Sequence, residues 1–89
     1  MRRYLLDEEK LVKFVKRARE RWSDFEVLRI IQKRSKQILY VSVRGSIVKL
    51  IIYPNGTLRS FGRAEGLAVA VKNILARVLG VEHHRSESG

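Results

Sequence analysis

Apolar and polar residues alternate through the middle of the chain, and this pattern predicts three antiparallel strands joined by two hairpins. The first two strands are expected at Ile38–Arg44 and Ile47–Tyr53. Gly45-Ser46 between them is typical of a two-residue type II′ turn, in which glycine takes the first central position. This turn would pair Arg44 with Ile47 and direct every second side chain of both strands to one face.

Pro54-Asn55-Gly56 is the second turn and is typical of a three-residue hairpin loop, with glycine in the left-handed position. A two-residue Asn-Gly turn would push Arg59 into the aliphatic face, so we favour the longer loop, which places Leu58 opposite Ile52. The predicted aliphatic face comprises Leu39, Val41, Val43, Val48, Leu50, Ile52 and Leu58. The opposite face comprises Ile38, Tyr40, Ser42, Arg44, Ile47, Lys49, Ile51, Tyr53, Thr57, Arg59 and Phe61.

One amphipathic helix is predicted before these strands and one after them, each with a single apolar stripe at helical spacing. The first covers residues 7–22, where Asp7 can cap the first turn. The second covers about Ala64–Leu79, and Gly80 follows it as a typical left-handed C-terminal cap. The stripes consist of Leu11, Phe14, Val15, Ala18 and Trp22 in the first helix and of Leu67, Val71, Ile74, Leu75 and Val78 in the second.

Residues 25–31 (FEVLRII) predict a further strand whose facing is ambiguous. Leu28 and Ile30 share one side, and Arg29 shares the other side with the remaining apolar residues. Those residues are Phe25, Val27 and Ile31. We favour Leu28 and Ile30 inward, because an inward Arg29 would need a buried partner for its charge.

The predicted order is therefore α-β-β-β-β-α, an α+β fold with a four-stranded antiparallel sheet. Each helix has one apolar stripe and the sheet has one aliphatic face. We therefore expect both helices on that face and the other face open to solvent. A single domain is expected over residues 1–81, followed by a disordered polar tail at residues 82–89.

Composition adds a strong positive charge, since 19 Lys and Arg against 9 Asp and Glu give a net charge of +10. Such an excess favours a polyanionic partner, nucleic acid above all. The alternative is a thermophile-like composition rich in Arg, Lys, Ile and Val, but heat adaptation normally raises Glu together with Lys. The chain has no Cys, no apolar run of membrane-spanning length and no signal-peptide core. We therefore expect an intracellular, cytoplasmic protein that does not bind membranes.

Residues that could support catalysis are few and scattered. His83 and His84 are adjacent in the polar tail, where neighbouring side chains point apart. No Ser has a candidate base nearby, no paired carboxylates share a face, and Gly56, Gly62 and Gly66 do not form a phosphate-binding loop. We therefore expect no enzymatic activity, no cofactor, no metal site and no small-molecule substrate.

Cations and aromatic rings interleave on the predicted open face, where rings can stack on bases and cations can neutralise phosphates. The loop at residues 32–36 adds three positive charges, which can grip phosphates or guard a sheet edge. The predicted nucleic-acid site comprises Arg29, Lys33, Arg34, Lys36, Tyr40, Arg44, Lys49, Tyr53, Arg59, Phe61 and Arg63. The pattern leaves DNA and RNA open.

Three isoleucines on the same face, Ile38, Ile47 and Ile51, support an alternative. Exposed aliphatic side chains on an open sheet also suit a protein interface. The alternative function is a protein-interaction module, or a homodimer formed sheet to sheet.

The segment KLIIYPNGTLRSFGR, residues 49–63, continues into the second predicted helix. Its spacing resembles one repeat of the TATA-box-binding protein family, with the pattern ALIFxSGKxxxTGA followed by a helix. Gly56 and Gly62 match the two family glycines, Leu58 falls on a core methionine, and Tyr53 falls on a phenylalanine that wedges between base steps. The resemblance implies a sheet face that lies in the DNA minor groove.

Other positions depart from that family. Lys36 stands where the second wedge phenylalanine would be, Phe61 replaces a base-contacting threonine, and Arg59 replaces a small apolar base contact. Only one repeat is present, so a saddle would require a dimer. The double-stranded-RNA-binding domain and the Alu-binding proteins of the signal recognition particle also look like α-β-β-β-α, but their basic helix motif is not evident.

Overall fold

The computed structural model describes residues 5–81 and has the element order predicted from the sequence. The elements are α1 (Glu8–Arg21), β1 (Glu26–Gln32), β2 (Gln37–Val43), β3 (Ser46–Ile52), β4 (Leu58–Phe61) and α2 (Glu65–Leu79). The four strands form one antiparallel sheet in the order β1-β2-β3-β4. The α-β-β-β-β-α prediction is confirmed, and the tail predicted at residues 82–89 lies outside the described residues.

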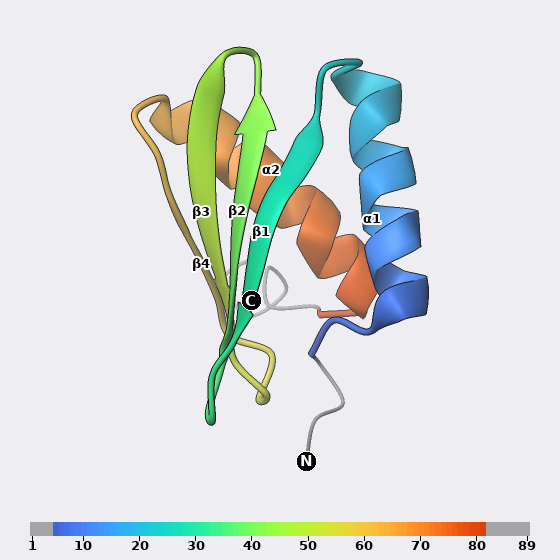
Figure 1. Ribbon diagram of the computed structural model, residues 1–89, viewed down its shortest axis with the longest axis vertical. Helices are drawn as coiled ribbons and strands as arrows, with labels where there is room; N and C mark the ends of the chain where they lie inside the picture. The colour runs from blue at the N-terminus through green and yellow to red at the C-terminus, as the bar shows by residue number, and fades with distance from the viewer. Residues whose placement is uncertain (1–4, 82–89) are drawn as a thin grey trace, which may run out of the picture.

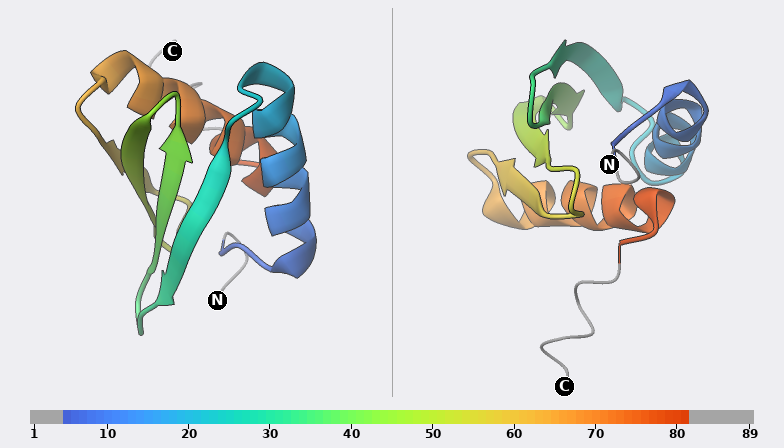
Figure 2. Two further views of the ribbon diagram at one scale, coloured as in Figure 1. Left: turned by 45° about the horizontal axis from the view of Figure 1, so that its top comes forward. Right: turned by 90° about the horizontal axis from the view of Figure 1, so that it is seen from below.

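Both helices lie on the same side of the sheet (Figures 1 and 2). Helix α2 packs against β4 and β3 and passes diagonally behind the sheet in Figure 1, while α1 runs beside β1 and packs against α2. The core between these layers contains large side chains that are almost completely buried. They are Phe14, Phe25, Leu39, Val41, Val43, Val48, Leu50, Ile52, Val71 and Leu75.

The helix ends follow the predicted signals. The Asp7 side chain accepts a hydrogen bond from the Lys10 backbone N–H at 2.8 Å, which satisfies one of the free donors of the first turn of α1. Gly80 adopts φ +80° after α2, the left-handed cap that other residues adopt only with strain.

The β2–β3 turn lies one residue earlier than predicted, which changes the pairing register of the two strands by two residues. Arg44 and Gly45, with φ of +53° and +77°, are its central residues, and Val43 pairs with Ser46. Two positive φ values are typical of a type I′ turn, which matches the twist of the strands. The Arg44 N–H also donates to Asp24 Oδ2 at 2.7 Å. Because the shift is by two residues, every strand side chain keeps its face, but Arg44 leaves the sheet for the turn.

The β3–β4 hairpin has the predicted register, in which Ile52 pairs with Leu58. The Tyr53 N–H donates to the Thr57 carbonyl at 2.9 Å, and Gly56 has φ +97°. These features fit a three-residue loop with a glycine bulge.

The facing predicted for the first strand is wrong for Leu28, Phe25 and Val27, whereas Arg29 and Ile30 lie on the sides predicted for them. A bulge between Val27 and Arg29 interrupts the alternation, so Leu28 is 49% exposed instead of inward. Phe25 and Val27, which the prediction placed outward, pack on the core instead. Ile30 does pair with the buried Leu39, but it lies on an edge strand and is 41% exposed.

Gln37, the first residue of β2, has a buried polar side chain that was not predicted from the sequence. Its Oε1 accepts from the Leu6 N–H at 2.6 Å, and its Nε2 donates to the Leu6 carbonyl at 3.0 Å. Nε2 also donates to Gln32 Oε1 at 2.9 Å. The amide thus fastens the segment before α1 to the sheet.

Candidate nucleic-acid interface

One row of side chains crosses all four strands on the face that neither helix covers. Strand pairing places Arg29, Tyr40, Lys49 and Phe61 side by side in that order, and we call them the cation–aromatic row. The bulge in β1 brings Arg29 into this row. It adds one residue between Val27 and Arg29, so Arg29 pairs with Tyr40 and lies on the open face. Strands lie about 4.8 Å apart, so the two rings are separated by about 10 Å with a cation between them.

Lys49 and Phe61 also contact each other within this row. The Lys49 Nζ lies 5.9 Å from the centre of the Phe61 ring, and Phe61 is 48% exposed. A cation–π contact at an exposed site is worth about 0.5–1 kcal/mol. A ligand could displace this contact at small cost, because stacking of one base on a ring is worth about 1–3 kcal/mol.

The neighbouring row is more apolar and contains Ile31, Ile38, Ile51 and Arg59. Arg59, at the β4 end of this row, is exposed. Ile51, which the sequence placed on the accessible face, points to that side but is only 8% exposed. It lies on a central strand with Ile38 and Arg59 across from it, so these long neighbours shield it from solvent. Ile51 is therefore not available to a ligand.

A basic loop borders this face at one end of the sheet, where β1 turns into β2. The Lys33 N–H donates to the Lys36 carbonyl at 2.8 Å, which closes the turn around the exposed Arg34. The Lys36 Nζ lies 6.0 Å from the centre of the half-buried Tyr53 ring. Lys36 and Tyr53 are thus neighbours at this end of the sheet, on the far side of the Ile31–Arg59 row from the cation–aromatic row.

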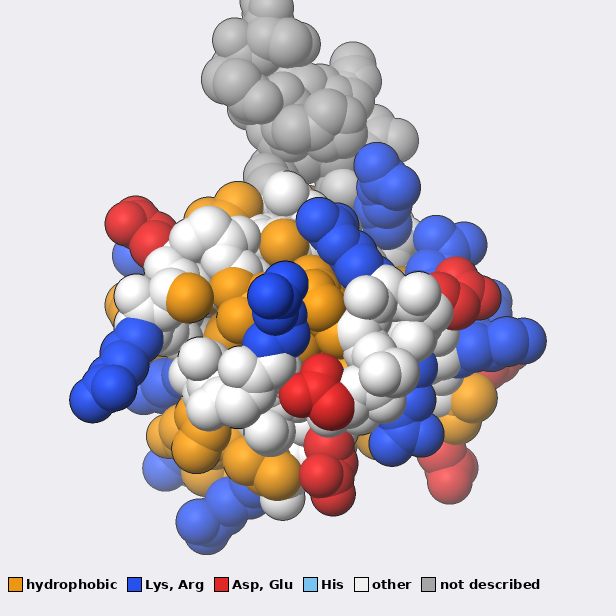
Figure 3. Space-filling model, turned by 90° about the horizontal axis from the view of Figure 1, so that it is seen from above, with side chains coloured by type: hydrophobic (Ala, Val, Ile, Leu, Met, Phe, Trp, Pro, Cys, Tyr) orange, Lys and Arg blue, Asp and Glu red, His pale blue; other side chains and the backbone are white. Residues whose placement is uncertain are grey.

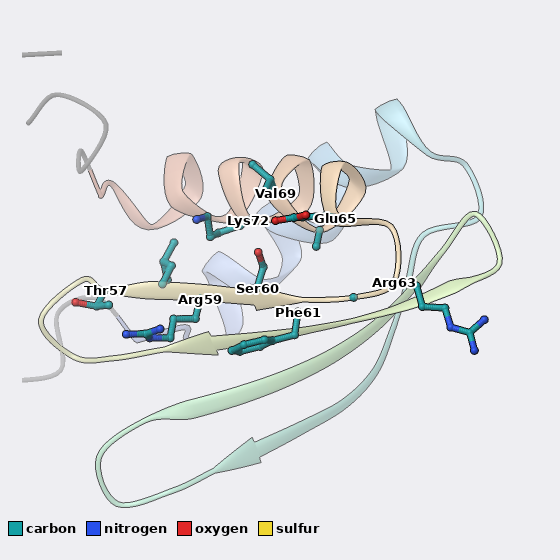
Figure 4. A pocket seen from close by; sticks show the side chains of 11 residues that line it. Thr57, Arg59, Ser60, Phe61, Arg63, Glu65, Val69 and Lys72 are labelled. Atoms are coloured by element: carbon teal, nitrogen blue, oxygen red, sulfur yellow. The ribbon is translucent and has the colours of Figure 1, made fainter. Parts of the chain in front are cut away.

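Two of the predicted site residues lie away from this group. Arg44 sits in the β2–β3 turn and Arg63 follows β4, both at the end of the sheet opposite the basic loop. Figure 4 shows Arg63 pointing outward from β4. The structure therefore brings Arg29, Tyr40, Lys49 and Phe61 into one row with Arg59 in the next row, and it places the loop cations and Tyr53 at one end of the sheet and Arg44 and Arg63 toward the other.

Positive charge is spread around the molecule and is not confined to the open face. Figure 3 shows Lys and Arg side chains on several sides of the molecule in the view from above, with Asp and Glu side chains among them. The open face is distinguished by its aromatic rings beside the cations, since the basic face of α1 lacks such a platform. Glu26, opposite Ser42, contributes the acidic side chain at the margin of the described part of this face.

Other kinds of site find no support between residues 5 and 81. The described residues contain no group of three or more His, Cys, Asp or Glu side chains that could hold a metal ion. None of the described helices is long and apolar enough to cross a membrane.

A groove of about 790 Å³ lies between β4 and α2, at a place where the sequence predicted no site. Its α2 wall includes Val69 and Lys72. The strand order could have indicated it, because the last strand of a sheet has a free edge. The facing of α2 against that edge could not be read from the apolar stripe alone.

Comparison with known proteins adds no relative: no protein family, no curated protein and no solved structure matches the chain significantly.

Proposed function

We propose that this protein binds nucleic acid on its open sheet face and performs no catalysis. The observation that carries the proposal is the cation–aromatic row, an uncovered platform in which Arg29 and Lys49 alternate with Tyr40 and Phe61. Rings on a sheet stack on unpaired bases, and cations between them neutralise phosphates. The net charge of +10 supports the same partner by steering a polyanion toward the protein.

The resemblance to the TATA-box-binding protein family suggests duplex DNA as one target. The support for this version is the element order, a hairpin with a glycine bulge followed by a helix. In this version of the proposal, the Tyr53 ring wedges between base steps, and a dimer provides the second half of the saddle. Single-stranded nucleic acid is the target favoured by the cation–aromatic row.

Titrations followed by fluorescence anisotropy test the proposal and choose between these targets. Labelled duplex DNA, duplex RNA and single strands are titrated at about 50 mM and about 200 mM salt. If about six phosphates are neutralised, the log–log salt slope is about −5 on duplex DNA and about −4 on a single strand. Affinity that does not depend on salt would contradict the proposal.

A matched pair of triple variants locates the site. Replacement of Arg29, Lys49 and Arg59 by Ala is expected to weaken binding at least about fivefold more than replacement of Lys13, Arg17 and Arg77 by Ala. Both sets contain two Arg and one Lys, and the control set is exposed on the two helices. Equal losses would show that total charge, and not the open face, determines binding.

A sheet-to-sheet homodimer is the second candidate, and it rests on Ile47, which is 59% exposed on the same face. Sedimentation at high salt would then detect a dimer that Ile47→Glu dissociates. Ile47 is the better position for this test than Ile51, because a charge at the buried Ile51 would destabilise the fold itself.

A further inference from the structure

Strand β4 is an edge of the sheet with backbone groups directed outward. In an antiparallel pair, residues whose backbones bond the partner alternate with residues whose backbones do not. The backbones of Tyr53 and Thr57 are hydrogen-bonded to each other. By this alternation, the backbone N–H and carbonyl groups of Arg59 and Phe61 also point toward β3. The N–H and carbonyl groups of Leu58 and Ser60 therefore point to the free edge.

Helix α2 forms a wall along this edge and turns it into the groove of about 790 Å³. Ser60 points toward α2, whereas Arg59 and Phe61 point to the other side of the strand (Figure 4). On the helix, Val69 is 40% exposed and faces the groove together with Lys72. The groove thus offers a wall on which the exposed Val69 lies beside Lys72, along an unpaired strand edge.

The charges that line the groove are mostly positive. Lys72 and Glu65 lie on the α2 wall, Arg59 contributes a cation on the other side of β4, and Arg63 at the end of the groove points away from it (Figure 4). A second copy of this chain paired through β4 would bring these cations close to one another, which disfavours self-association. The complementary occupant is an extended segment that carries acidic side chains.

We propose that the β4 edge and the α2 wall bind an extended acidic segment of another protein, which adds to the sheet as a fifth strand. The other edge is less suited to this role, because the bulge in β1 interrupts its row of backbone groups. The proposal concerns a different surface from the nucleic-acid face, although Arg59 and Phe61 border both surfaces.

The probe is a fluorescein-labelled peptide in which Glu and Val alternate over seven residues. One side of such a strand packs Val side chains on Val69, and its other side presents Glu side chains to Arg59. We expect binding that falls about tenfold or more when Lys replaces every Glu in the peptide. The Leu58 and Ser60 amides should exchange with solvent deuterium more slowly in the complex, as followed by NMR.

Backbone pairing is tested by N-methylation of the peptide. Only alternate amides of a strand face its neighbour. One version of the peptide therefore carries N-methyl groups on the Val residues, and the other carries them on the Glu residues. One version should lose about tenfold or more in affinity, since it loses its hydrogen bonds to β4, while the other should bind nearly as well as the parent. If both versions bind like the parent, the proposal is wrong.

Two helical valines provide the matched protein variants. Val69→Glu places a negative charge on the groove wall and should lower the affinity for the peptide at least about tenfold. Val12→Glu makes the same change on α1, where Val12 is 63% exposed, and should change the affinity less than about twofold. Circular dichroism establishes that both variants fold.

The two proposals can fail separately. If the peptide is weakened by Lys49→Ala and not by Val69→Glu, it binds the open face as a mimic of nucleic acid, and the β4 proposal is overturned. If nucleic acid fails to bind while the Leu58 and Ser60 amides are protected by the peptide, the β4 proposal stands and the proposed function does not.

Discussion

Both faces of the sheet contain aliphatic side chains, yet the two faces serve different roles. Val48 and Ile47 are neighbours in β3, but Val48 is 1% exposed under the helices and Ile47 is 59% exposed on the open face. On the core side the aliphatic positions continue from β2 to β3 beneath α2. On the open side, cations and rings interrupt them. The difference teaches that what covers a position, and not its own hydropathy, decides whether it stabilises the fold.

The largest effect is expected from one substitution made on each side of β3. Val48→Lys buries a charge without a partner and should lower the free energy of unfolding by about 4 kcal/mol or more, enough to prevent folding of a marginally stable domain. Ile47→Lys, one residue away, should change it by less than about 0.5 kcal/mol. Urea denaturation measures both values. Similar losses would mean that the open face is covered in solution.

A smaller effect is expected at Ile51, which points to the open face but is buried. Ile51→Ala should lower the free energy of unfolding by about 2–3 kcal/mol, because it removes a shielded side chain from the middle of the sheet. Ile47→Ala is the control and should have little effect. If the two variants were equally stable in urea, the neighbours of Ile51 would not shield it.

The smallest effect concerns the turn that joins the two central strands. Arg44→Asn should raise the free energy of unfolding by about 0.5–1 kcal/mol, because Asn adopts positive φ more readily than Arg and Asn-Gly favours a type I′ turn. Thermal denaturation measures the gain, and Gly45→Ala should cause a loss. A loss for Arg44→Asn would contradict the turn type.

Much of the fold could be predicted because several signals agreed. Asp7, Gly80 and the Pro54-Asn55-Gly56 turn each predicted an element boundary that the structure confirms. The β2–β3 turn was predicted in the wrong place, because a type II′ turn at Gly45-Ser46 and a type I′ turn at Arg44-Gly45 both fit the sequence. The hydrogen bond from the Arg44 N–H to Asp24 favours the type I′ turn. Asp24 lies 20 residues away along the chain, so the local sequence does not reveal this contact.

The candidate site was only partly predictable for a similar reason. Alternation assigned Tyr40, Lys49 and Phe61 to one face, because period-two patterns survive a register shift by two residues. The bulge that carries Arg29 into the same row has no clear local signal in the sequence. The groove beside β4 depends on how α2 crosses the sheet, which is a property of tertiary packing.

The buried amide of Gln37 has a consequence for how the molecule opens. It connects Leu6 and Gln32, so one side chain holds both the lead-in to α1 and the base of the loop that contains Lys33 and Lys36. Release of either segment removes hydrogen bonds that hold the Gln37 amide in place, so the opening of one segment favours the opening of the other. A polyanion that immobilised the loop would in this way also slow hydrogen exchange at Leu6, on the far side of the sheet from the phosphates.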